Sequence, residues 1–483
     1  MIYKLIKLIT APSSIYVIIR YFTYILQFVN AILLARYLDV FYFGVYSFIN
    51  LVMQYMSYSN LGINESLNTE YSTNKQNISR LNDIWNNAWS INVLWNIFIM
   101  IGFYMILSMS HNLFGNYEFD NYKYLLLATC IIVNLSRIYI TYYKLQGKLF
   151  KINVQQLLPN VCLFLLTISI RERLNISIIL YTLLICHTLT LLIFRIGIPS
   201  IPKFSLDRYW VIVLIKRGIA LLLYNLSFYI LTLVASSFVS AYYSVEMFGC
   251  YSFANTLVNG VIMAGGAFMF IFYPKILNRL NTDNIEAYGV IKKIREVYIV
   301  FMDIVSLLSI VGVFVISPII SQYGEVMITL YSMLILGRIV NNSSTGYAAL
   351  LISRGKEQLL IIYGFLSVFI LLACSLCIYV FNFDIHTVAL SIAVASFIYT
   401  YLVIRSARSS LKISVSCRLV IKEIFGVKKW LICLIILLYT FILHSPWFLL
   451  AGIFTYCAMN SVNIKKSITS GYTILIDKNA LSF

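Results

Sequence analysis

Two arginines inside apolar segments are the residues of this chain whose type and position point most directly to chemistry. Arg137 lies in the apolar segment 124–144, and Arg338 lies in the apolar segment 326–352, 201 residues further along the chain. A charged side chain inside a membrane-spanning segment is costly, so each arginine needs a partner or a function. A guanidinium donates two parallel hydrogen bonds and binds phosphate well. The pair predicts an anion site, and the alternative is that both side chains extend to the lipid–water interface.

Four further polar side chains within apolar segments extend this candidate site. Arg20 either joins the anion site or extends to the cytoplasmic interface, which lies roughly 9 Å away at the start of its helix. Asn341, three residues after Arg338, is expected to bond either sugar hydroxyls or a neighbouring helix. Asp303 is expected either to form a structural ion pair or to bind H⁺ or Na⁺ during transport. His187 either titrates near neutral pH or is a hydrogen-bonded structural histidine, so Asp303 and His187 are the ion-coupling candidates.

The composition is that of a membrane protein. Of the 483 residues, 61% are hydrophobic and 11% are charged, whereas soluble domains are about a quarter charged. The nine cysteines lack the spacing of a zinc site, so we expect no metal and no bound cofactor. The segments long enough to cross a bilayer are 14–36, 41–63, 86–108, 124–144, 153–170, 175–196, 218–241, 247–273, 297–317, 326–352, 359–381, 386–404, 429–444 and 446–463. The sequence therefore predicts an all-α polytopic membrane protein with about 14 transmembrane helices, the last two forming a hairpin.

The chain contains an internal repeat. Residues 43–50 read FGVYSFIN and residues 248–255 read FGCYSFAN, 205 residues apart, and at that offset 21–50 and 226–255 match at twelve of thirty positions. Each copy holds six helices, an even number, so the two copies enter the membrane in the same direction. Parallel repeats are typical of transporters that move one half against the other around a central site. We expect two parallel six-helix lobes and a C-terminal part, with the boundaries 1–196, 197–404 and 405–483.

The basic residues predict the orientation of the chain in the membrane. With the N-terminus in the cytoplasm, 29 of the 36 Lys and Arg residues fall in cytoplasmic segments. This bias predicts that both termini are cytoplasmic. It also explains the net charge of +18 by contact with anionic membrane lipid, with no nucleic-acid partner. The chain has no P-loop, GxSxG, HExxH or dinucleotide-binding motif, and we therefore expect that it is not an enzyme.

Several short motifs resemble one family of transporters over about residues 14–404. They are Ala35-Arg36-Tyr37-Leu38, Phe43-Gly44-x-Tyr46-Ser47-Phe48, Asn60-Leu61-Gly62-Ile63-Asn64, Gly147-Lys148, Phe248-Gly249-x-Tyr251-Ser252-Phe253 and Tyr273-Pro274-Lys275. Their order and spacing resemble the polysaccharide-exporter branch of the multidrug/oligosaccharidyl-lipid/polysaccharide superfamily, the Wzx-type flippases of O-antigen or capsule repeat units. The resemblance implies a flippase that moves undecaprenyl-pyrophosphate-linked oligosaccharides across the bacterial inner membrane by alternating access, for lipopolysaccharide or capsule synthesis.

The resemblance also implies roles and partners. Arg20, Arg137 and Arg338 would contact the pyrophosphate or acidic sugars, and Arg36 would be an exit-side basic residue present in one lobe only, because Ala241 replaces it in the second copy. Transport would be coupled to H⁺, Na⁺ or the membrane potential. The expected partners are the lipid-linked glycan, membrane lipid, and a polysaccharide polymerase with its chain-length regulator.

Two alternatives compete with this prediction. A cation-coupled multidrug exporter of the same superfamily would require a carboxylate in the N-terminal lobe, and no acidic residue lies within the first six predicted spans. A polysaccharide polymerase or ligase would require a large outer loop for its acceptor, and no outer segment of this chain is long. Both observations favour the flippase.

Overall fold

The computed structural model of the chain describes residues 12–74, 78–109, 114–196, 202–280 and 283–476. Within these ranges the chain is helical throughout, with no β-strand, as the sequence predicts. Its internal contacts divide it into two compact units, Met1–Leu226 (unit 1) and Ser227–Phe483 (unit 2). The division falls within one long helix, and the predicted lobe boundaries at 196/197 and 404/405 stay predictions.

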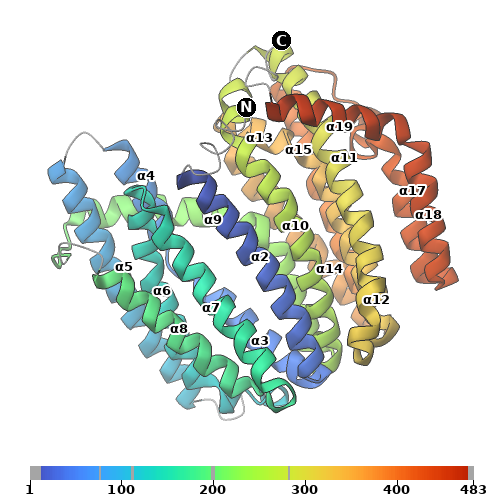
Figure 1. Cartoon of the computed structure of the whole chain (residues 1–483). Helices are drawn as coiled ribbons and strands as arrows, with labels where there is room; N and C mark the ends of the chain where they lie inside the picture. The colour runs from blue at the N-terminus through green and yellow to red at the C-terminus, as the bar shows by residue number, and fades with distance from the viewer. Residues whose placement is uncertain (1–11, 75–77, 110–113, 197–201, 281–282, 477–483) are drawn as a thin grey trace, which may run out of the picture. The chain divides into compact units, whose positions relative to one another are not determined.

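Unit 1 is a layered bundle of helices (Figure 1). α2 packs against α7, and both α6 and α7 pack against α8. A buried apolar cluster that includes Leu67, Trp85, Tyr143, Phe194 and Leu214 joins α4, α5, α6, α8 and the first half of α9. The helices are α2 (Pro12–Tyr37), α3 (Val40–Tyr58), α4 (Ile63–Thr73), α5 (Ile78–Met109), α6 (Lys123–Leu145), α7 (Leu149–Ile170), α8 (Ile176–Ile196) and the start of α9 (Arg208–Tyr242).

Unit 2 is built around α12, which packs against α10, α11 and α15, while α14 covers α15 (Figure 1). After the rest of α9, its helices are α10 (Val245–Leu280), α11 (Asn284–Ile316), α12 (Gly324–Asn341), α13 (Tyr347–Ser353), α14 (Glu357–Val380), α15 (Ile385–Ser410), α16 (Cys417–Ile424), α17 (Lys429–Leu438), α18 (Pro446–Met459) and α19 (Ser461–Ile476). The predicted C-terminal hairpin is formed by α17 and α18. They pack so closely that a Cβ at Gly452 would lie 2.5 Å from the Ile435 side chain.

The polytopic architecture is confirmed, whereas the number of about 14 spans stays a prediction. In the described part of the chain, eight stretches are long and apolar enough to cross a membrane, or up to ten with two bent helix pairs. One of them, 284–344, has 61 residues and would extend about 90 Å as a single helix, three times the bilayer core. It is instead a hairpin of α11 and α12, because the Tyr331 hydroxyl donates to Ser309 Oγ at 2.5 Å across the turn.

The internal repeat is visible in the helix boundaries. α2 ends at Tyr37 and α9 at Tyr242, while α3 begins at Val40 and α10 at Val245, and both pairs are 205 residues apart. Both starts are capped by a side chain at the same relative position. Asp39 Oδ1 accepts the amide of Tyr42, and Ser244 Oγ accepts the amide of Met247. The repeat therefore specifies the same helix–turn–helix in both units.

The helix ends at Gly147 and Gly355 also match. Both glycines have positive φ, at 70° and 66°. The amides of the following residues, Lys148 and Lys356, each donate to the carbonyl five residues earlier, at 2.9 and 2.8 Å. This is the left-handed glycine cap that satisfies the last carbonyls of a helix. The Gly-Lys motif thus has a structural cause in both copies.

The segment before α9 is attached to α5 through backbone hydrogen bonds. Three alternate amides of this extended segment donate to side chains of α5, joining Lys203 to Asn86, Ser205 to Ser90 and Asp207 to Asn87 at 2.7–3.0 Å. α9 then begins at Arg208, ten residues before the predicted span 218–241. Its first turns pack on the unit 1 core and account for much of the predicted cytoplasmic connection.

The predicted span 41–63 is broken. α3 ends at Tyr58 and α4 begins at Ile63, with Leu61 and Gly62 in the left-handed region at φ 53° and 68°. The backbone of Gly62 meets that of Gly218 in α9, and a Cβ at Gly62 would collide with the Gly218 carbonyl. The equivalent helix α10 has no such break.

We expect Gly62→Ala to destabilise the protein strongly, because the new Cβ would collide with the backbone of α9. Gly147→Ala is the matched control: Gly147 has a similar φ of 70° but open space around its Cβ position. The free energy of unfolding of the control should fall by only about 1–2 kcal/mol, which is the cost of a positive φ for alanine. Thermal unfolding of both purified variants in one detergent measures the difference, and equal losses would contradict the close backbone contact.

Candidate functional site

Arg137 binds the broken end of α3. It lies in α6, and its guanidinium donates from Nη1 to the Ser57 carbonyl at 2.7 Å. The last carbonyls of a helix have no partner within that helix and carry a partial negative charge of about half an electron. Arg137 is half-buried, and its direct acceptor is a neutral backbone carbonyl.

Two further polar groups of unit 1 lie within electrostatic range of Arg137. One is His187 of α8, whose Nδ1 is buried with no hydrogen-bond partner in the described part of the chain. The other is Glu65 of α4, whose Oε2 is likewise buried without a partner there. The structure therefore brings two predicted site residues, Arg137 and His187, together with a carboxylate that sequence analysis missed. Glu65 was missed because it lies just beyond the predicted span 41–63.

Arg338 has the same helical position in unit 2 as Arg137 has in unit 1. α12 begins 201 residues after α6, so each arginine is the fifteenth residue of its helix. Arg338 Nη2 donates to Thr232 Oγ1 of α9 at 2.9 Å, and the rings of Tyr229 and Tyr251 lie nearby. Its direct acceptor is also neutral. Both units thus hold an equivalent arginine bonded to a neutral oxygen, and their meeting in one cavity stays a prediction.

Asn341 is the last residue of α12, one turn after Arg338. Its Oδ1 is buried and has no hydrogen-bond partner among the described residues. The short 3-10 helix Asn342–Ser344 and Gly346, with φ 86°, follow before α13. The corresponding end of α6 lacks this interruption, which explains why the arginines are 201 residues apart and the Gly-Lys ends 208.

The other predicted basic residues lie on α2. Arg20 is half-buried and donates from Nε to the Tyr24 hydroxyl at 2.6 Å, one turn further along. Arg36 is exposed in the last turn of α2, with its guanidinium 5.7 Å from the centre of the Tyr37 ring. Their roles as substrate contacts stay predictions.

Asp303 forms a buried ion pair with Lys429. Asp303 Oδ1 lies 3.1 Å from Lys429 Nζ, with side chains 0% and 1% exposed. Lys429 also donates to the Ile339 carbonyl at 2.8 Å, and the Tyr456 hydroxyl donates to Asp303 Oδ2 at 3.3 Å. Four helices, α11, α12, α17 and α18, therefore meet at this pair. The structural ion pair that the sequence offered as one alternative for Asp303 is therefore present, with Lys429 as the cation that a buried carboxylate requires.

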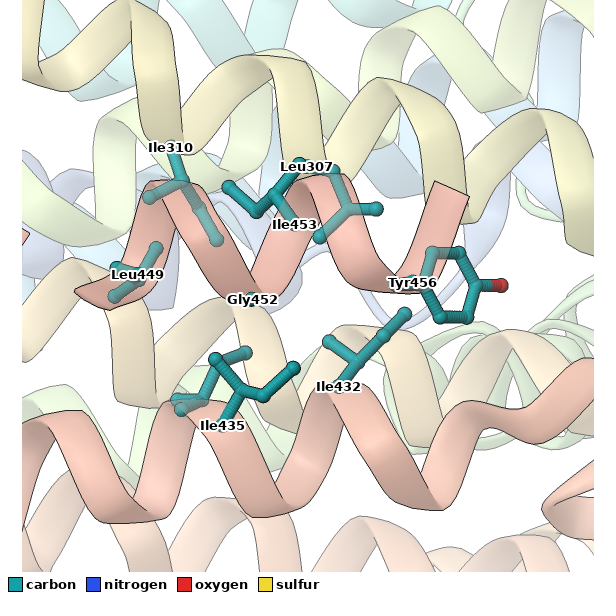
Figure 2. A pocket seen from close by; sticks show the side chains of 9 residues that line it. Leu307, Ile310, Ile432, Ile435, Leu449, Gly452, Ile453 and Tyr456 are labelled. Carbon is teal, nitrogen blue, oxygen red and sulfur yellow. The ribbon is translucent and has the colours of Figure 1, made fainter. Parts of the chain in front are cut away.

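An apolar pocket adjoins this ion pair. Figure 2 shows Ile432 and Ile435 of α17 facing Leu449 and Ile453 of α18, with the Tyr456 hydroxyl directed away from them. The remaining lining residues are Leu307, Ile310, Ile436 and Gly452. The pocket between the hairpin and α11 is lined mainly by apolar side chains, and Lys429 and Tyr456 make the polar contacts of the hairpin with Asp303.

A second charged cluster lies where α11, α15 and α16 meet. Glu423 binds Arg295 at 3.3 Å and Arg408 at 3.0 Å, and the two arginines are 8% and 5% exposed. Arg295 also donates to the Ser343 carbonyl, and Arg408 donates to the Ser414 carbonyl at 2.9 Å. Two buried guanidinium groups thus share one carboxylate, which attaches α16 to the rest of unit 2.

Comparison with known proteins identifies solved structures that share this fold. No family model matches the chain, and no curated protein matches it. Among solved structures it is similar to "Lipid II flippase MurJ, inward closed conformation", with a TM-score of 0.64 and 15% identity over 94% of this chain and 99% of that chain. It is also similar to an inward-facing multidrug resistance MATE family transporter of the MOP superfamily, with a TM-score of 0.61 and 11% identity over 81% of this chain and 94% of that chain.

A third solved structure, MATE in the straight conformation, has a TM-score of 0.55 and 13% identity over 83% of this chain and 94% of that chain. These similarities extend over 94–99% of each neighbour's chain and over 81–94% of this chain. The chain therefore has the fold shared by the lipid II flippase and the MATE transporters.

Proposed function

We propose that this protein is a flippase that moves undecaprenyl-pyrophosphate-linked oligosaccharide repeat units across the bacterial inner membrane for surface polysaccharide synthesis. The observation that carries the proposal is the pair of arginines at the same helical position in both units, each bonded to a neutral oxygen. The fold similarity to a lipid II flippase over 94% of the chain supports it. So does the motif resemblance to Wzx-type exporters.

The physical task of such a flippase is to shield a diphosphate from hydrocarbon. Transfer of an unpaired charge into an apolar medium costs many kcal/mol, so a cationic path is required. In the proposed mechanism, Arg137 and Arg338 bind the diphosphate, polar groups such as Asn341 contact the glycan, and the prenyl chain stays in the lipid. Both termini are cytoplasmic, and H⁺ or Na⁺ coupling involves His187 or Asp303.

A cation-coupled multidrug exporter is the second candidate, and Glu65 is the observation that favours it. Glu65 supplies the buried carboxylate in unit 1 that such an exporter requires. Arg137 lies within electrostatic range of this carboxylate, so a cationic drug would compete with the guanidinium for it. Ethidium efflux separates the two functions. Efflux by the wild type that Glu65→Gln abolishes would favour the exporter, whereas the flippase predicts no efflux.

We expect Arg338→Ala to abolish surface glycan in cells that depend on this protein, because half of the phosphate site is lost. Lipid-linked repeat units should accumulate in the cytoplasmic leaflet, and Arg338→Lys should retain part of the activity, since an ammonium keeps the charge but not the paired donors. Arg405→Ala is the control, because Arg405 is exposed at the end of α15. Gel analysis of surface polysaccharide and extraction of lipid-linked saccharides are the measurements, and normal surface glycan in Arg338→Ala would contradict the site.

A further inference from the structure

The end of α3 is held by side chains from two neighbouring helices. Trp95 of α5 donates from its indole nitrogen to the Ser59 carbonyl at 2.5 Å. Asn134 of α6 donates to the Met56 carbonyl at 3.3 Å. The carbonyls at a helix end need such partners when water is excluded. Trp95 and Asn134 therefore stabilise the end of α3 at this position.

Arg137 is the charged member of this cap. A guanidinium has five N–H donors, and the Ser57 carbonyl accepts from Nη1. In this structure the helix end, with its partial negative charge, occupies the place that an anion would take beside the arginine. A phosphate carries a full charge and two oxygens for paired hydrogen bonds, so it binds a guanidinium more strongly than a carbonyl does.

Among the described residues, unit 2 has no equivalent of this cap. α10 is continuous from Val245 to Leu280, where unit 1 has α3, the break and α4. Arg338 donates to the hydroxyl of Thr232. If this hydrogen bond breaks, no helix end loses a cap. The two equivalent arginines therefore differ in what they release when they bind another acceptor.

The break also contacts α9, the helix that continues into unit 2. Gly62 lies against the backbone of Gly218, and Arg217 Nη1 binds Glu70 Oε1 of α4 at 2.5 Å. The end of α3 therefore lies next to the contacts that join α4 to α9, and a movement of this end would affect them.

We infer that the end of α3 and the anionic headgroup of the substrate compete for Arg137, and that Trp95 and Asn134 are positioning residues that hold the helix end when Arg137 leaves it. The inference rests on the proposed function and assigns Arg137 two alternating acceptors. When the headgroup binds, the Ser57 carbonyl loses its hydrogen bond to Arg137 and residues 57–63 become more mobile. The contacts between α4 and α9 change as a result. Release of the headgroup restores the cap.

Hydrogen exchange of the amides of residues 57–63 tests the inference. The full-length protein in lipid nanodiscs is measured with and without undecaprenyl pyrophosphate, and binding of this probe is measured separately. In the wild type we expect exchange to rise on the order of tenfold with the probe, as for the loss of one charge-assisted hydrogen bond. In the variant Arg137→Met, exchange at residues 57–63 should be high even without the probe, and the probe should not change it. In Arg338→Met basal exchange should stay at the wild-type value while binding weakens.

Trp95→Phe distinguishes a positioning residue from a substrate contact. It keeps the ring but removes the donor to Ser59, so basal exchange at 57–63 should rise while the probe still binds. Probe binding by the wild type without any change at 57–63 would overturn the inference and leave the proposed function intact. Absence of probe binding would overturn the proposed function and the inference with it.

Discussion

Asp303→Leu is expected to prevent accumulation of folded protein, whereas the double variant Asp303→Leu/Lys429→Met is expected to fold. The single change leaves the Lys429 ammonium, 1% exposed, without its carboxylate. Breaking a buried ion pair costs about 3–5 kcal/mol, while replacing both partners with apolar side chains is often neutral or stabilising. Monodisperse yield after detergent extraction and apparent melting temperature are the measurements.

The double variant also decides the role of Asp303 in transport. If the pair only attaches the α17–α18 hairpin to α11 and α12, the folded double variant should still export glycan. The direct contacts of Lys429 with the Ile339 carbonyl and of Tyr456 with Asp303 favour this structural role. A folded double variant without export would instead assign Asp303 to ion coupling. Tyr456→Phe is a milder companion, since it removes one hydrogen bond and should cost about 1 kcal/mol.

The repeat predicts much of the fold because it records local features. Helix length, apolar content and caps depend on neighbouring residues, so the copies end at Tyr37 and Tyr242 and restart at Val40 and Val245. The same repeat places Arg137 and Arg338 in equivalent helices from the sequence alone. What the repeat does not predict is where the copies differ, as at the break in unit 1 that α10 lacks.

The partners of the candidate residues could not be predicted from the sequence, for physical reasons. Arg137 binds the backbone carbonyl of Ser57, and a carbonyl is present at every residue, so no pattern marks it. Lys429 lies at the start of its span, where basic residues normally face water, and its partner Asp303 is 126 residues away. The break itself had a signal: Asn60-Leu61-Gly62 contains a glycine suited to positive φ, but the apolar run through it favoured a continuous helix.

Loss of Glu423 is the second change for which we expect a severe effect. Glu423→Ala leaves Arg295 and Arg408, 8% and 5% exposed, as two buried like charges without a carboxylate. Their remaining hydrogen bonds to carbonyls satisfy donors but not charge, so the loss should be at least the about 3–5 kcal/mol of a broken buried pair. We expect α16 to detach and the protein to unfold at markedly lower temperature.

A surface ion pair of the same unit provides the control for Glu423. Glu296 lies 3.9 Å from Lys466, with side chains 43% and 70% exposed. Exposed pairs contribute about 0–1 kcal/mol, so Glu296→Ala should leave the melting temperature nearly unchanged. The two changes each remove one glutamate, and they differ in burial and in the number of basic partners, which is two for Glu423 and one for Glu296. Equal melting temperatures for the two variants would mean that water reaches Arg295 and Arg408, and the attachment of α16 through Glu423 would have to be abandoned.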